Sequence, residues 1–227
     1  PTLLAGGTLV IRSEDQAGSL NAFLALLRNR GLTVLNLPAS FWHVLVEEMA
    51  HRALALPASV RLIITGSERI QPSALAEWQK LAPACGWING YGPTETTITA
   101  TAHAPDLTAG PVDASRDVPI GRPLPHALAY VLAFDRSLAP RGAEGSLHIG
   151  GPAVTRGYLN QPEATAAAFG ADPFAPQGGR IYNTGDRARW RPDGALDFLG
   201  RRDRQVKLRG QRIDLGEIER TLAQFES

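Results

Sequence analysis

The stretch "VRLIITG", residues 60–66, decides the fold class of this chain. Its apolar residues follow one another without alternation, which is typical of a strand in a parallel sheet that is covered on both faces. Two other apolar runs, "TLVI" and "LTVLNL", alternate with helical patterns at 20–29, 39–52 and 73–81. Ser73 is the expected N-cap of the last of these helices. This rhythm predicts an α/β fold with a parallel βαβ-type subdomain over residues 1–110.

Residues 111–200 have a different sequence pattern. Their segments are short, rich in Gly and Pro and often alternating, as in "AYVLAF" and "GSLHIGG", which indicates antiparallel strands and hairpins. Pro-Asp-Gly at 192–194 is a typical hairpin turn. We expect a mostly antiparallel, β-barrel-like subdomain here. Over residues 201–227 the charge density rises before a final helical pattern, so this segment is interpreted as a junction.

Composition excludes several classes of partner. The chain has 227 residues, 44% of them hydrophobic, which is enough for a sizeable core. A formal net charge of +1 provides no long-range field for nucleic acid or an anionic membrane, so neither is expected as a partner. The longest apolar stretch, near residues 127–134, is far shorter than the roughly 20 residues of a membrane helix. A single cysteine, Cys85, excludes an internal disulfide and favours a cytoplasmic location.

Several kinds of catalytic site are also absent from the sequence. The five histidines lack metal-ligand spacing, and one cysteine supplies no pair of thiolates for zinc. There is no G-x-S-x-G elbow and no G-x-x-x-x-G-K-[ST] phosphate loop. The glycines of "GSLHIGGPAVTRGYLN" lack the G-x-G-x-x-G spacing of a dinucleotide fingerprint. Hydrolase, P-loop and Rossmann interpretations are therefore rejected.

The polar run "NGYGPTETT", residues 89–97, follows an apolar strand and is a candidate phosphate site. Its glycines allow close approach of the backbone, its threonine hydroxyls can donate to phosphate oxygens, and Tyr91 offers a stacking face. Glu95 is a suitable ligand for Mg²⁺. "TGSE", residues 65–68, lies at the end of a neighbouring strand, where ligands of parallel sheets gather. The alternative is an ordinary polar turn around a buried tyrosine.

Two further segments carry candidate chemistry. In "YNTGDRARW", residues 182–190, Asp186 follows a glycine turn and suits the paired hydroxyls of a ribose. The alternative is an aspartate that only caps the turn. The five basic residues of "GRRDRQVKLRG", residues 200–210, either form a solvated face or include contacts to a nucleotide.

Taken in order, these segments resemble the successive core motifs of the adenylation domains of nonribosomal peptide synthetases, within the adenylate-forming superfamily. The motifs are "NGYGPTETT", "GSLHIGGPAVTRGYL", "YNTGDRARW" and "GRRDRQVKLRGQRIDLGEIE". The resemblance covers essentially the whole chain. It implies a large N-terminal domain of α/β subdomains and a β-barrel, joined by a hinge to a small C-terminal domain that residues 201–227 begin.

The resemblance also implies roles for individual residues. Catalytic roles fall to Thr94, Glu95 and Lys207, with Glu95 binding magnesium, and Asp203 is implied as the hinge. Asn89 and Tyr91 are implied to contact the adenine, Thr94 the phosphate, and Asp186 the ribose hydroxyls. The complete set implied to bind the nucleotide is Gly66, Ser67, Asn89, Gly90, Tyr91, Gly92, Thr94, Asp186, Phe198, Arg201 and Lys207. These assignments require Glu95 and Asp186 to share one cleft.

The implied reaction joins an amino acid carboxylate to the α-phosphate of ATP and releases pyrophosphate. The implied cofactors are ATP, Mg²⁺ and the phosphopantetheine of a carrier (thiolation) domain. The implied partners are that carrier domain and a condensation domain of the same synthetase. The resemblance implies a substrate pocket lined by Asn36, Ile63, Thr65, Gly90, Ile98 and Thr99. Three polar groups in that set favour a polar or small substrate side chain. The alternative is that these groups satisfy one another or water.

The chain departs from the family pattern in three places. The phosphate loop and the aspartate that fixes the substrate amino group normally precede Pro1, and most of the C-terminal domain with its lysine is missing. We therefore expect residues 1–227 alone to be inactive. Ser146 stands where the family usually has Glu.

Two other functions compete with this interpretation. An acyl- or aryl-CoA ligase uses the same adenylate chemistry, but such ligases commonly carry Pro where this chain has Leu215 and Gly216. A noncatalytic nucleotide-binding module would keep the fold without turnover. The joint presence of Glu95, Asp186 and Lys207 argues against that module.

Overall fold

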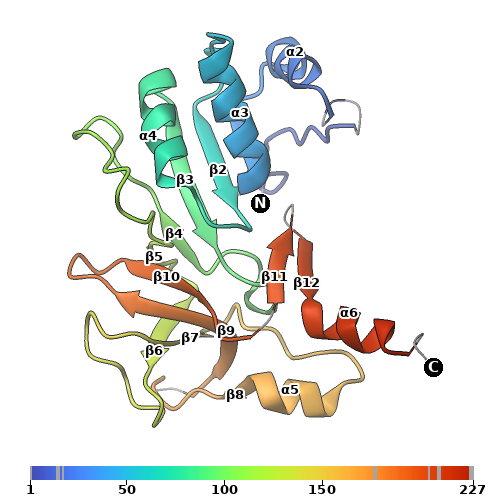
Figure 1. Cartoon of the computed structure of the whole chain (residues 1–227), viewed down its shortest axis with the longest axis vertical. Coiled ribbons are helices and arrows are strands. Elements are labelled where there is room, and N and C mark those ends of the chain that lie inside the picture. The colour runs from blue at the N-terminus through green and yellow to red at the C-terminus, as the bar shows by residue number, and fades with distance from the viewer. Residues whose placement is uncertain are drawn as a thin grey trace.

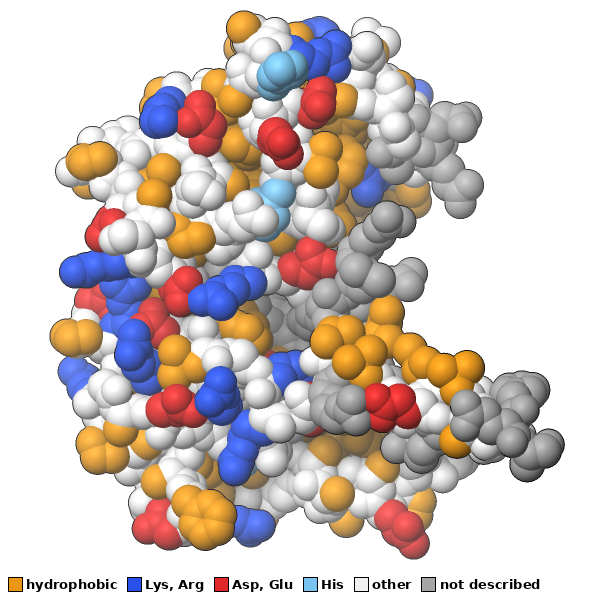
Figure 2. Space-filling model, in the orientation of Figure 1, with side chains coloured by type: hydrophobic (Ala, Val, Ile, Leu, Met, Phe, Trp, Pro, Cys, Tyr) orange, Lys and Arg blue, Asp and Glu red, His pale blue; other side chains and the backbone are white. Residues whose placement is uncertain are grey.

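A computed structural model describes residues 2–13, 16, 18–175, 178–203, 205–208 and 211–224. Figure 1 shows an upper part of helices and strands, a lower part built mainly of strands, and a small hairpin with a helix at one side. Basic and acidic side chains are mixed on the face seen in Figure 2 and do not gather into a patch of one sign. In the part of the chain described, no helix has the length and apolar character needed to cross a membrane.

The upper part is built on a five-stranded sheet. Strands β1 (Val34–Pro38), β2 (Leu62–Gly66) and β3 (Gly86–Tyr91) are parallel, and β4 (Thr101–His103) and β5 (Arg122–Pro123) continue the sheet in antiparallel pairing. Helices α3 (Ala39–His51) and α4 (Pro72–Leu81) pack on it through Trp42, Trp78 and Trp87. Along β1, Leu35 and Leu37 are buried whereas Val34 and Asn36 are exposed. The parallel sheet is confirmed, but its two faces are not equally covered.

Helix boundaries agree with the sequence in most places. Helix α2 spans Leu20–Arg30, with the Ser19 hydroxyl accepting the Ala22 N–H and with Gly31 in the left-handed conformation at φ 56°, which is the usual residue for that position. The expected strand at 8–11 is not formed. The prediction of Ser73 as N-cap is also wrong, because α4 begins at Pro72, whose fixed φ suits the first helical position.

The lower part is an antiparallel sheet, which is the kind of sheet expected after residue 110, although β5 belongs to the upper sheet. Its order is β10 (Leu196–Arg201), β9 (Arg180–Trp190), β7 (Gly145–Gly150) and β6 (Leu128–Leu132), and β8 (Phe169–Ala171) pairs with the start of β9. The described strands form an open sheet and do not close into a barrel. The predicted hairpin turn lies between β9 and β10, with Gly194 at φ 81° and its N–H donating to the Arg191 carbonyl at 3.0 Å.

Backbone hydrogen bonds join the two sheets at Leu196. The Ile120 N–H donates to the Leu196 carbonyl, and the Leu196 N–H donates to the Gly121 carbonyl, both at 2.8 Å. Gly121 has φ 85°, and a Cβ there would lie 1.9 Å from the Ala102 carbonyl oxygen. Only glycine fits so close a backbone approach. This joint brings the carboxyl ends of β2 and β3 next to β9 and β10.

The last described segment is a hairpin of β11 (Gln205–Leu208) and β12 (Gln211–Asp214), followed by helix α6 (Leu215–Leu222). It stands to one side of the two larger parts (Figure 1). Two short helices complete the described structure: α5 (Pro162–Ala168), and the single 3-10 turn η1 (Thr94–Thr96) inside the polar run that follows β3.

Candidate functional site

A cavity of about 440 Å³ lies where the two sheets meet, at the carboxyl ends of β2 and β3. This is the edge at which ligands of parallel sheets bind. Residues from five segments line it: Ser67, Glu68, Arg69, Ile70, Asn89, Gly90, Tyr91, Gly92, Val118, Ile120, Asp186, Phe198, Gly200, Arg201, Asp203, Gln205 and Val206. The cavity therefore brings together the two strand-end loops, the Thr-Gly-Asp turn and the segment that follows β10.

Asp186 lines this cavity and is hydrogen-bonded to two other lining residues. Its carboxylate accepts from the Tyr91 hydroxyl through Oδ2 and from Arg201 Nη1 through Oδ1, the latter at 2.6 Å. The turn before it is closed by a 3.0 Å bond from the Asp186 N–H to the Thr184 hydroxyl, with Gly185 at φ 76°. Burial, together with the adjacent Asp186 carboxylate, raises the pKa of Tyr91 well above its ordinary value, so the phenol remains a donor.

Arg201 connects Asp186 to the predicted hinge residue. Its Nε and Nη2 donate to the two oxygens of Asp203 at 2.7 and 2.6 Å, and Nη2 also donates to Gln205 Oε1 at 2.9 Å. These bonds to Asp203 are the main reason that the pKa of Arg201 is raised. A Cβ on Gly185 would lie 2.7 Å from Arg201 Nη2, so the turn leaves the guanidinium the space it occupies.

The remaining predicted nucleotide residues lie around this cluster. Asn89 is buried, and its Nδ2 donates to the Pro119 carbonyl at 3.0 Å. The Phe198 ring lies 6.3 Å from the Tyr91 ring, centroid to centroid. A Cβ on Gly66 would lie 2.6 Å from the Gly90 carbonyl oxygen, so the two strand ends are in close contact, although Gly66 itself does not line the cavity. Lys207 belongs to β11, and its side chain lies outside the described residues.

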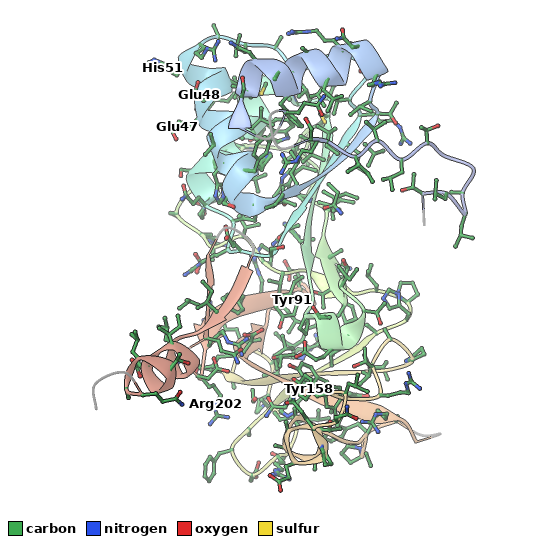
Figure 3. The ribbon with its side chains drawn as sticks, turned by 90° about the vertical axis from the view of Figure 1, so that its right-hand side faces the viewer. Glu47, Glu48, His51, Tyr91, Tyr158 and Arg202 are labelled. Carbon is green, nitrogen blue, oxygen red and sulfur yellow. The ribbon has the colours of Figure 1, made fainter. Side chains whose placement is uncertain are left out.

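Glu95 lies outside the cavity lining, in contrast to Asp186. The residue is 8% exposed, its side chain accepts from the Tyr158 hydroxyl at 2.7 Å, and its carbonyl accepts the Thr155 N–H at 2.9 Å. Thr94 is exposed on the same turn. Of the two carboxylates expected to share one cleft, Asp186 therefore lines the cavity and Glu95 does not. Figure 3 shows Tyr91 at the level of the joint and Tyr158 below it.

The magnesium expectation is compatible with these residues. Within the described ranges there is no group of three or more His, Cys, Asp or Glu side chains that could hold a metal ion. Mg²⁺ is usually bound by one or two carboxylates together with substrate phosphates and water, not by an all-protein cage. A single glutamate on the strand-end loop fits that kind of site.

The six predicted pocket residues do not all share a surface. Ile63 and Thr65 are fully buried on the face that carries Leu35 and Leu37, whereas Asn36 pairs with Ile64 on the opposite face. Gly90 and Thr99 do meet, because a Cβ on Gly90 would lie 3.4 Å from Thr99 Cγ2. Ile98 is 75% exposed.

Sequence reasoning missed two contacts in this region. Tyr158, which holds Glu95, occurs in the quoted motif "VTRGYL", but nothing in the local pattern connects it with a residue 63 positions earlier. The bidentate pairing of Arg201 with Asp203 was not predicted either. A basic residue two positions before an acidic one in a glycine-bounded segment was the available signal.

Comparison with known proteins gives consistent matches. Residues 1–159 match the family model described as AMP-binding enzyme. The chain is 41% identical over 225 residues to the dimodular nonribosomal peptide synthase of Bacillus subtilis (strain 168), covering 98% of this chain and 9% of that protein. It is 40% identical over 226 residues to tyrocidine synthase 1 of Brevibacillus parabrevis, covering 99% of this chain and 19% of that protein.

Solved structures give the same result. PA1221, described as a nonribosomal peptide synthetase protein containing adenylation and PCP domains, has a TM-score of 0.85 and 30% identity over 97% of this chain and 43% of its own. The crystal structure of IdnL1 has a TM-score of 0.87 and 30% identity over 99% of this chain and 46% of its own. The chain thus spans a small part of the curated relatives and less than half of these structures.

Proposed function

Because the chain belongs to the AMP-binding enzyme family, we propose that it is part of a nonribosomal peptide synthetase adenylation domain that activates an amino acid with ATP. In the proposed reaction a carboxylate oxygen of the amino acid attacks the α-phosphorus of ATP. The bond from that phosphorus to the bridging oxygen breaks, and pyrophosphate leaves with the electron pair. Aminoacyl-AMP is the product.

The cluster of Tyr91, Asp186 and Arg201 in the cavity is the observation that carries this proposal. Asp186 is a buried carboxylate that accepts from Tyr91 and Arg201. An ionised carboxylate has about four acceptor sites, so Asp186 can accept the two hydroxyls of a ribose as well. The Tyr91 ring and the side chains of Ile70 and Ile120 provide apolar lining for an adenine. A volume of about 440 Å³ falls within the range of roughly 300–1,000 Å³ found for small-molecule sites.

Charge near the phosphates would come from this chain's own side chains and a metal ion. Arg201 is held at the cavity by Asp186 and Asp203, and Arg69 also lines the cavity. Glu95 and Thr94 lie together on the turn after β3, so both can serve a triphosphate that extends past the loop. A bound Mg²⁺ would disperse negative charge on the phosphates, with Glu95 as its protein ligand. Lys207 is assigned to the same end of the site.

The amino acid and the partner domains belong to the same proposal. A Cβ on Gly90 would lie 3.4 Å from Thr99 Cγ2 and 3.5 Å from the Thr65 carbonyl oxygen, so these three predicted pocket residues lie together, which supports a small or polar substrate side chain at that point. A carrier domain with phosphopantetheine would receive the aminoacyl group, as the PCP domain of PA1221 suggests. The proposal also includes a condensation domain as a partner and a cytoplasmic location. It places the boundaries between the subdomains of the chain after residues 110 and 200. Inactivity of residues 1–227 alone remains a prediction.

Binding of AMP to the protein tests the proposal without requiring turnover. We expect wild-type protein to bind AMP in calorimetry, and we expect Asp186→Asn to bind it about 10- to 100-fold more weakly, the loss of a hydrogen bond to a charged group. Asp197→Asn is the matched control. Asp197 is likewise a buried aspartate paired with an arginine, Arg189 at 3.0 Å, but it lies outside the cavity. Equal AMP affinity in both variants would overturn the assignment.

A further inference from the structure

The segment of residues 153–158 is hydrogen-bonded to the strand-end loop that carries Glu95. Three hydrogen bonds connect them: the Thr97 hydroxyl donates to the Ala153 carbonyl at 2.7 Å, the Thr155 N–H donates to the Glu95 carbonyl at 2.9 Å, and the Tyr158 hydroxyl donates to Glu95 Oε1 at 2.7 Å. The first two bonds fix the course of the loop, and the Tyr158 hydroxyl holds the carboxylate itself.

Tyr158 is in turn held by several neighbours. Its N–H donates to the Thr165 hydroxyl of α5 at 2.9 Å. Gly157, at φ 135°, has no room for a side chain, because a Cβ would lie 2.3 Å from Thr165 Cγ2. The Tyr158 ring packs edge-on against Phe169 at 5.5 Å, and Phe169 packs on Tyr182 at 4.8 Å. Helix α5 and strand β8 thus give Tyr158 a defined position.

We propose that Tyr158 is a positioning residue for Glu95, holding its carboxylate in the orientation in which it binds the metal ion of a nucleotide–metal complex. The inference rests on the proposed function, which makes Glu95 the protein ligand of Mg²⁺. A buried carboxylate with a free rotamer would lose entropy on binding the ion, whereas one fixed beforehand by a charge-assisted hydrogen bond loses less. A phenol suits this role because it donates to Oε1 without adding a charge beside the metal.

The hydroxyl of Tyr158 stays protonated at neutral pH. Burial, with the neighbouring Tyr182 and Glu95 side chains, raises its pKa above the ordinary value of 10.0. The donor is therefore present at neutral pH, and the contact needs no proton transfer to form.

Tyr158→Phe tests the inference. At a fixed ATP concentration we titrate Mg²⁺ and measure ATP binding by calorimetry. The variant is expected to need about 10-fold more Mg²⁺ for half-maximal binding, the value of a hydrogen bond to a charged group. Its affinity for AMP without Mg²⁺ is expected to stay within about 2-fold of wild type, because Tyr158 does not line the cavity. In a Glu95→Gln background the same substitution is expected to add nothing.

Tyr130→Phe is the matched control. It removes another tyrosine-to-carboxylate bond in the lower part, from Tyr130 to Asp172 Oδ2 at 3.1 Å, and neither residue lines the cavity. The control is expected to leave the Mg²⁺ requirement at the wild-type value. If Tyr158→Phe does not fold, Thr165→Val replaces it, because it removes the acceptor of the Tyr158 N–H while keeping the shape. Thr165→Val is expected to shift the Mg²⁺ requirement in the same direction.

The outcomes separate two failures. A folded Tyr158→Phe protein, or a folded Thr165→Val protein in its place, with the wild-type Mg²⁺ requirement overturns the role of Tyr158 alone. Wild-type protein that binds neither AMP nor ATP with Mg²⁺ overturns the proposed function, and the inference with it.

Discussion

Replacing Arg201 with methionine removes the cation from the buried side of the cavity and keeps a side chain of similar length. Arg201 is the partner of both Asp186 and Asp203. In the Arg201→Met variant, Asp186 retains the Tyr91 hydroxyl as a donor but loses its counter-charge. The prediction is a loss of stability at neutral pH that is large for a single substitution.

The magnitude follows from burial. The side chains of Asp186 and Arg201 are only 8% and 17% exposed, so solvent screens their attraction weakly. Removing one partner of a buried ion pair costs about 3–5 kcal/mol, because the other charge is left uncompensated. The bond from Tyr91 keeps the expected loss near the lower end of that range. For a chain of this length, about 3 kcal/mol corresponds to a decrease in Tm of roughly 6–12 °C.

Urea and thermal unfolding of both proteins at pH 7 measure this loss. Arg52→Met is the control, since Arg52 pairs with Glu48 at 3.6 Å and these side chains are 38% and 41% exposed. An exposed pair of this kind contributes about 1 kcal/mol or less. If Arg201→Met destabilises the protein no more than Arg52→Met does, the buried ion pair does not hold the site together as described.

Three further predictions concern stability. The neutral imidazole of His43 accepts the Gln71 N–H at 3.1 Å, and burial lowers the pKa of His43 below 6.5. The contribution of His43 to stability is therefore complete above pH 6.5 and is lost as the pH falls below that value. Wild-type protein should lose more unfolding free energy than His43→Gln as the pH is lowered from neutral through this range, and equal slopes of unfolding free energy against pH would refute this. Gly121→Ala should prevent folding or lower the free energy of unfolding by more than about 3 kcal/mol. The matched variant Gly142→Ala should lower it by about 1–2 kcal/mol, because Gly142 has φ 86° and open space around it. Similar melting temperatures of the two variants would contradict the close backbone contact at Gly121. Ser146→Glu should stabilise the protein by about 1 kcal/mol in urea unfolding. Position 146 lies opposite Arg187, whose buried Nε has no hydrogen-bond acceptor among the described residues. An unchanged unfolding midpoint would show that the new carboxylate does not reach Arg187 Nε.

The strands and helices that local pattern could predict are those whose pattern repeats. "VRLIITG" and its neighbours indicated the parallel strands because continuous apolar runs are typical of buried strands. "TLVI" has the same composition, but Leu9 and Ile11 are exposed and the run pairs with no described strand. A strand needs a partner for its backbone groups, and composition does not reveal whether one is present.

The candidate site was predicted as a set of motifs, and the contacts between them were not. The order of the motifs and their resemblance to the family predicted that Tyr91, Asp186 and Arg201 belong to one nucleotide site. Local pattern could not assign Asn36 to the face opposite Thr65, because the strand register depends on tertiary pairing. Nor could it place Glu95 against a tyrosine of a later segment instead of in the cavity beside Asp186. Such contacts depend on how the two sheets join at Gly121.

The central claim is that the cavity between the two sheets binds the nucleotide, and a crystal structure of the protein with AMP tests it most directly. We expect AMP in the 440 Å³ cavity, with the adenine against Tyr91 and the ribose hydroxyls on Asp186. AMP bound instead in the open groove of α3 and α4, between His43 and Glu77, with the cavity empty, would contradict it.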